Sequence, residues 1–181
     1  KTILIVLTCI AQLSVPATMI YQHELTLKSG TEYRFEVRPI DPADPFRGRY
    51  VRLDFVQQQM AESQRYLPGV ELFADGQHSA YAVLGVDESG LANLTSLSMI
   101  KPDTADYIKV DVSIYNQEIY SLKFPFDRYY ANETKAPSME SVVRDRSRVD
   151  SLQIVTATVS IRNGRGVISQ LWVGEQTIED F

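Results

Sequence analysis

The chain has 181 residues, of which 44% are hydrophobic and 23% are charged. These values are typical of a globular protein and exclude a disordered chain, a collagen and a low-complexity repeat. The formal net charge is −5, and it argues against a nucleic-acid partner, because phosphate contacts need clustered cations. The only cysteine, Cys9, excludes an internal disulfide framework and a multi-cysteine metal site.

An uncharged apolar run of 19 residues extends from Ile3 to Tyr21. As a helix it would span about 28 Å, which is enough to cross the apolar core of a bilayer. We therefore expect a transmembrane signal anchor over residues 1–22, in contact with membrane lipid through residues 3–21. A single exported domain over residues 23–181 would follow, because Lys1 favours an inside N-terminus. Two alternatives remain open: a signal peptide cleaved after Ala17, and a helix buried in the protein core.

Gln12 lies in the middle of this apolar run. A carboxamide in hydrocarbon seeks a hydrogen-bond partner, so Gln12 is a candidate contact to a neighbouring transmembrane helix. The alternative is that it is a tolerated polar residue whose amide bonds to its own backbone.

After His23 the apolar residues recur with a period of two, which is typical of β-strands. We expect a first hairpin with Leu25 and Leu27 on one strand, a turn at Ser29-Gly30, and Tyr33 to Val37 on the other. Asn163-Gly164 predicts a second tight hairpin. The predicted strands beyond the first hairpin cover residues 51–55, 108–114, 120–124, 155–161 and 167–173, with weaker ones at 70–73, 81–86 and 94–100.

The same alternation predicts which side chains share a face. Tyr120, Leu122 and Phe124 are expected together on one face of their strand, and Leu171 and Ile168 on opposite faces of theirs. One amphipathic helix is predicted from Pro137 to Val149. The predicted fold is mainly β, an antiparallel sandwich or irregular barrel with one amphipathic helix, preceded by the N-terminal transmembrane helix.

Residues 39–55 contain three prolines within seven positions, which predicts a stiff, extended arm that leads into a strand at Tyr50. The arm is the main candidate binding site, because arginine side chains on it can grip a carboxylate or phosphate. In the alternative interpretation these arginines pair with nearby aspartates and the prolines only direct the chain. The candidate residues here are Asp41, Asp44, Arg47, Gly48, Arg49, Tyr50 and Arg52.

This arm resembles the signature Gly-Asp-Tyr-x-x-Leu-x-Tyr of the bacterial GDYXXLXY proteins, through Gly48, Arg49, Tyr50, Leu53 and Phe55. Residues 126–130, Phe-Asp-Arg-Tyr-Tyr, resemble a second motif of that family. Arg49 stands where the signature has Asp, and Phe55 where it has the final Tyr. The charge reversal at Arg49 puts in doubt any family role that needs the carboxylate. The resemblance implies a membrane-anchored exported domain that works beside polytopic membrane proteins, and it brings no established activity.

The aromatic residues of the second motif have two interpretations. Phe126, Tyr129 and Tyr130 can line a ligand groove, or they can fill the core, as aromatic residues of β domains commonly do. We keep Tyr129 and Tyr130 as candidate binding residues.

Known catalytic motifs do not occur in the sequence. With only His23 and His78, it has no metalloprotease histidine pair, and the glycines at 85 and 90 lack the Lys-Ser/Thr of a phosphate-binding loop. We therefore predict no catalytic residue, no metal site and no cofactor. The favoured function is a non-enzymatic envelope protein at the bacterial inner membrane, with a periplasmic or extracellular domain that binds or stabilises a membrane or envelope partner. The alternative is an envelope hydrolase or ligand-binding enzyme whose site assembles only in the fold.

Overall fold

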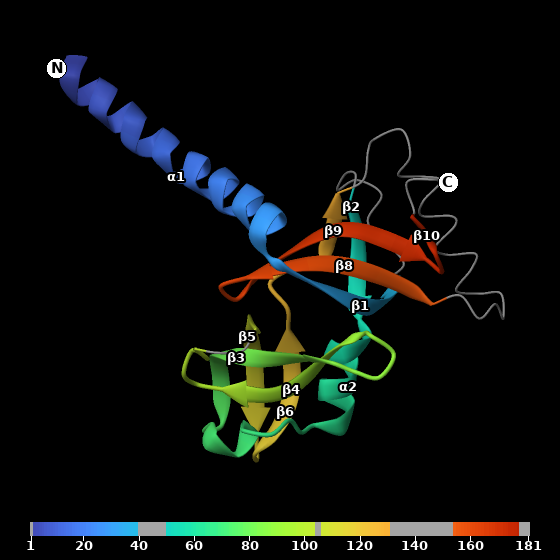
Figure 1. Cartoon of the computed structure of the whole chain (residues 1–181). Coiled ribbons are helices and arrows are strands. Elements are labelled where there is room, and N and C mark those ends of the chain that lie inside the picture. Colours follow the sequence, from blue (N-terminus) through green and yellow to red (C-terminus); the bar gives the residue numbers. More distant parts are fainter. Residues whose placement is uncertain (1, 40–49, 104–105, 131–153, 178–181) are drawn as a thin grey trace.

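A computed structural model describes residues 2–39, 50–103, 106–130 and 154–177 (Figure 1). Its helices are α1 (Thr2–Ser29), α2 (Val56–Gln64) and the short 3-10 helix η1 (Val70–Leu72). Its strands are β1 (Thr31–Pro39), β2 (Tyr50–Phe55), β3 (Gly76–Val86), β4 (Ala92–Ser98), β5 (Tyr107–Tyr115), β6 (Glu118–Lys123), β7 (Arg128–Tyr130), β8 (Val155–Arg162), β9 (Arg165–Val173) and β10 (Gln176–Thr177).

The strands form two antiparallel sheets. One has six strands in the order β10-β9-β8-β1-β2-β7, and the other has four in the order β4-β3-β5-β6. The six-stranded sheet curls like half a barrel, and the four-stranded sheet lies beside it with α2 at its flank (Figure 1). The prediction of a mainly antiparallel β fold is confirmed.

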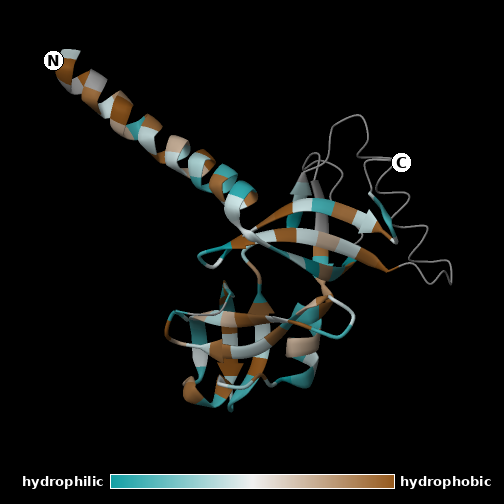
Figure 2. Ribbon diagram, viewed as in Figure 1, coloured by the Kyte–Doolittle hydropathy of each residue, from teal (hydrophilic) through white to brown (hydrophobic). Residues whose placement is uncertain are grey.

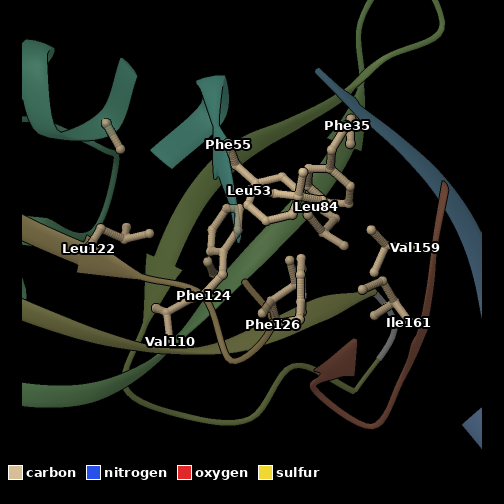
Figure 3. Packing of buried hydrophobic residues seen from close by; sticks show 14 of the residues in the cluster. Phe35, Leu53, Phe55, Leu84, Val110, Leu122, Phe124, Phe126, Val159 and Ile161 are labelled. Atoms are coloured by element: carbon tan, nitrogen blue, oxygen red, sulfur yellow. The ribbon is translucent and has the colours of Figure 1, made fainter. Parts of the chain in front are cut away.

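Four phenylalanines join the two sheets into one core (Figure 3). Phe35 on β1 and Phe55 on β2 pack against Phe124 and Phe126, which lie between β6 and β7. Their ring centroids are 5.3–6.0 Å apart, mostly in edge-on arrangements that favour aromatic pairs. Phe55 is 1% exposed and Leu53 is 3% exposed, so the last two residues of the family-like signature belong to the core.

Most of the predicted strands are confirmed. Strands β2, β3, β4, β5, β6, β8 and β9 all overlap the ranges expected from the period of two. The turn at Asn163-Gly164 has both residues at positive φ, 52° and 78°, as a two-residue hairpin turn requires.

The first predicted hairpin is wrong in its first strand, whereas its second strand, Tyr33 to Val37, lies within β1. Residues 23–29 continue α1 instead of forming a strand, because extending an existing helix needs no new nucleus. The helical interactions here include the i,i+4 ion pair of Glu24 and Lys28, which adds a few tenths of a kcal/mol. The alternation of Leu25 and Leu27 is too short to outweigh these helical interactions. The helix ends at Ser29, and a Cβ atom on the following Gly30 would lie 2.6 Å from the Thr26 carbonyl oxygen.

The weak strand predicted at 70–73 is also wrong. Residues Val70 to Leu72 form η1, which follows Gly69 at a φ of 95°. Val70 and Phe73 are apolar because they are buried in the core, and they pack there from a helical turn and not from a strand.

Two β-bulges shift the expected faces. In β6 the irregularity opposite Ser113 and Ile114 leaves Tyr120 at 68% exposure, while Ile119 is fully buried. In β9 the pairs Thr158–Gln170 and Val159–Ile168 leave Ser169 as the extra residue. Ile168 therefore packs against the core on the same side as Leu171, and not opposite to it.

Helix α2 was not predicted, and the helix predicted over residues 137–149 lies outside the described residues. The sequence of α2 is mostly polar, yet it buries Gln57 and Ala61 against the sheets. Its side chains also cover the edge of β6, since the Leu122 N–H donates to Glu62 Oε1 at 2.7 Å.

Helix α1 stands away from the β-sheets over most of its length (Figure 1). Its exposed large apolar side chains lie between 58% exposure at Leu7 and 78% at Ile3, so the alternative of a buried core helix is wrong. By length and mean hydropathy, no helix within the described residues qualifies as a membrane span.

Candidate functional site

The candidate site is a groove of about 610 Å³ at the junction between α1 and the curled sheet. One wall is the segment that leads from β6 into β7, and the other is the first half of β9. Its lining residues are His23, Pro125, Phe126, Asp127, Arg128, Tyr129, Gly166, Val167, Ile168 and Ser169. We call it the junction groove.

The junction groove continues along the end of α1. A second hollow of about 430 Å³ shares His23, Pro125, Gly166 and Val167 with it and adds Arg165. It also reaches Met19, Gln22 and Thr26 of α1. The two hollows therefore form one path from the exposed apolar part of α1 to β7.

The walls of the groove are fixed by close packing. Phe126 is 6% exposed, and a Cβ atom on Gly166 would lie 2.2 Å from its ring. Gly166 is therefore the residue that allows the β6–β7 segment to approach β9 this closely. On the other side, the Leu53 N–H donates to the Asp127 carbonyl at 2.8 Å, which holds that segment against β2.

Cations outnumber anions in the groove. Arg128 lies 3.5 Å from the Asp127 carboxylate, and Arg165 donates from Nη1 to Gln22 Oε1 of α1. Among the described residues that line the two hollows, two arginines therefore stand against one carboxylate. The groove favours an anionic or acidic group on whatever it binds.

The predicted site residues fall into three groups. Tyr129 lines the junction groove. Tyr50 and Arg52 lie on β2 opposite Tyr130 and Arg128 of β7, so the two family-like motifs are neighbours in one sheet. The remaining candidates of the arm, Asp41, Asp44, Arg47, Gly48 and Arg49, lie outside the described residues.

Sequence reasoning did not find the β9 wall of the groove. Residues 166–169 are separated from Tyr129 by more than 30 positions, and only the curl of the sheet brings them together. The lack of a side chain at Gly166 is the one local feature of the sequence that fits this close approach.

His78 lies in a different, polar hollow on the four-stranded sheet. That hollow of about 430 Å³ is lined by three serines together with Asp111 and Lys123. However, His78 Nε2 donates to the Ala74 carbonyl oxygen at 2.7 Å, so this nitrogen is engaged by the backbone and not by a serine hydroxyl. Within the described residues, no three His, Cys, Asp or Glu side chains converge as metal ligands.

Two groups away from the groove have shifted pKa values. Burial, then the hydrogen bond to Asp106 Oδ2 at 3.0 Å and the charge of that carboxylate, raise the pKa of Tyr33 to about 12. In the turn between β3 and β4, hydrogen bonds from the Ser89 hydroxyl and the Leu91 N–H lower the pKa of Asp87. The glycines at 85 and 90, which have the spacing of a phosphate-binding loop, therefore flank a turn that the Asp87 carboxylate holds together.

The chain was compared with known proteins. The model of the GDYXXLXY protein family matches residues 12–171, which covers most of the chain from α1 to β9. No curated protein and no solved structure matches it.

Proposed function

Because the chain belongs to the GDYXXLXY protein family, we propose that it is a single-pass protein of the bacterial inner membrane. Helix α1 is the anchor, and the β domain lies on the periplasmic or extracellular side. There it binds or stabilises a polytopic membrane protein, without catalysing a reaction.

The observation that carries this proposal is the exposure of apolar side chains on all sides of α1. Among them Ile3, Leu13 and Ile20 are 65–78% exposed. Figure 2 shows apolar residues recurring towards the free end of α1, and hydrophilic residues near its junction with the sheets. Water disfavours so much exposed apolar surface, and an all-round apolar helix is typical of one that lipid or protein surrounds.

The polar residues of α1 are compatible with lipid. The Ser14 hydroxyl donates to the Ala11 carbonyl and the Thr18 hydroxyl to the Ser14 carbonyl, each at 2.7 Å. These groups need no partner outside the helix. The mean hydropathy of α1 is lower than that of a typical membrane span. Part of the reason is that α1 contains these hydroxyl residues, which are hydrogen-bonded within the helix.

The junction groove would then lie close to the membrane surface. The second hollow, which continues it, lies beside Met19 and Gln22 at the end of the apolar part of α1. A protein embedded in the same membrane can therefore contact Gln12 of α1 and the groove at the same time. This geometry favours a membrane-protein partner over a freely diffusing one.

The proposal is tested by purifying the intact protein from its own membranes in native lipid discs. We expect a second membrane protein at a fixed ratio in native mass spectrometry, and a smaller yield of the complex for Gln12→Ala. The matched control is Ser14→Ala, which removes a hydroxyl already bonded within α1 and should leave the yield unchanged. Recovery of the chain only as a monomer would contradict the proposal.

A further inference from the structure

The polar hollow of about 430 Å³ that His78 borders lies on the outer face of the four-stranded sheet. Two rows of side chains line it, and each row runs across β3, β5 and β6. The first row is Gln77, Ser113 and Ser121, and the second is Ser79, Asp111 and Lys123. The hollow exists because the three serine side chains are short and leave space beside the longer ones. We call it the serine hollow.

Both rows point away from the core. The residues that alternate with them on the same strands, such as Ala80, Val110 and Leu122, are buried. Within the part of the chain that the structure describes, a single side-chain hydrogen bond lies inside the two rows. It runs from the Ser121 hydroxyl to the Ser113 hydroxyl at 3.3 Å. Most polar groups of the serine hollow are therefore available to a ligand.

Asp111 and Lys123 give the hollow one charge of each sign. They lie directly opposite each other on β5 and β6, yet no ion pair joins them among the described contacts. Strands disfavour Asp, so strand formation does not explain a carboxylate in the middle of β5. Because the two charges balance, the hollow complements a ligand without net charge.

The hydrogen-bonding groups define the ligand further. The Asp111 carboxylate only accepts, the Lys123 ammonium only donates, and the serine hydroxyls do both. A ligand that satisfies all of them needs many groups that both donate and accept. Hydroxyl groups have this property, and saccharides are the neutral molecules that carry them most densely.

An exposed aromatic ring extends the site along β5. Tyr115 is 67% exposed and lies on the same face of the strand as Asp111 and Ser113. The negative face of such a ring attracts the C–H groups of a sugar ring. From Asp111 to Tyr115 the strand rises about 13 Å, which is longer than one sugar ring.

We infer that the serine hollow binds a neutral saccharide of more than one ring, with Tyr115 as a stacking platform. This inference goes beyond the proposed function and does not depend on it. The junction groove lies at the end of α1 and beside β9, whereas the serine hollow lies on β3, β5 and β6.

The test uses the full-length chain in zwitterionic micelles, because a detergent with a sugar headgroup would compete for the site. The probes are β-1,4-linked tetrasaccharides of glucose and of N-acetylglucosamine, followed by titration calorimetry and saturation-transfer NMR. We expect at least one of them to bind with an affinity that salt does not change, since a neutral ligand is not screened.

Two variants locate the binding, and each has a matched control. Asp111→Asn should weaken binding about tenfold, because it removes a charged acceptor, and Tyr115→Ala about fivefold, because it removes the stacking ring. The controls are Glu88→Gln in the exposed turn between β3 and β4, and Tyr66→Ala at 52% exposure; both should leave the affinity unchanged. Circular dichroism of all four variants shows whether the fold is retained.

Four results would overturn the inference. They are a dissociation constant above about 10 mM for both probes, binding that Asp111→Asn and Tyr115→Ala do not weaken, binding that high salt abolishes, and tighter binding of a galacturonic acid tetrasaccharide, which would indicate an anion site. None of these results bears on the proposed function, which recovery of a companion membrane protein decides separately.

Discussion

Replacing Phe55 with alanine tests whether the family signature is part of the core. The Phe55 ring is 1% exposed and lies 5.3 Å from Phe126, 5.4 Å from Phe124 and 5.7 Å from Phe35. These partners come from two separate segments, β1 and the stretch between β6 and β7, so they cannot easily move together to fill the cavity. We therefore expect a loss of about 4–5 kcal/mol in the free energy of unfolding, the upper part of the range for Phe→Ala in a core.

The loss can be measured by urea unfolding of the full chain in mild micelles. The single tryptophan, Trp172, reports on the six-stranded sheet, and circular dichroism reports on both sheets. Tyr115→Ala, at 67% exposure on β5, is the control and should change the free energy by less than about 0.5 kcal/mol. A loss below about 1.5 kcal/mol for Phe55→Ala, together with loss of a partner, would refute the reasoning, because the residue would then act in binding.

Three further substitutions test local features of the structure. The raised pKa of Tyr33 stabilises the fold below pH 10, and this contribution disappears as the pH rises towards 12. Tyr33→Phe should therefore abolish this loss of stability between pH 10 and 12. In urea titrations at the two pH values, the free energy of unfolding of the unmodified protein should differ by no more than about 1 kcal/mol on account of this partly exposed group. Ser160→Ala should be neutral or stabilise by up to about 1 kcal/mol in thermal unfolding, because the fully buried Ser160 hydroxyl has no partner in the described structure. Gly69→Ala should cost about 2–3 kcal/mol in the same assay, since its φ is 95° and its Cβ would lie 2.1 Å from the Leu97 carbonyl oxygen; unchanged stability would contradict the described turn.

The sequence predicted strands well where apolar and polar residues alternate over a long stretch. β5 is the clearest case, because its buried and exposed residues follow each other almost without exception. The prediction of which side chains share a face failed at β-bulges, where one extra residue such as Ser169 moves the neighbouring side chains to the other face. The strand predicted at Leu25 and Leu27 also failed, because these residues extend an existing helix.

The candidate site was only partly predictable, because its walls come from distant parts of the chain. The aromatic motif at 126–130 suggested either a groove or core packing, and Phe126 and Tyr129 do both: they line the groove, and each is 6% exposed and belongs to the core. The β9 wall depends on the curl of the six-stranded sheet. No local pattern around Gly166 encodes that curl.

The reactivity of Cys9 tests the central claim, membrane anchoring by α1, most directly. Cys9 is the only cysteine and is exposed on α1. In lipid its thiol is out of reach of reagents dissolved in water, so a membrane-impermeant maleimide added to intact spheroplasts should leave it unlabelled until detergent is added. Labelling of Cys9 at the rate of a control cysteine placed at Ser89, in the exposed turn of the β domain, would contradict the claim.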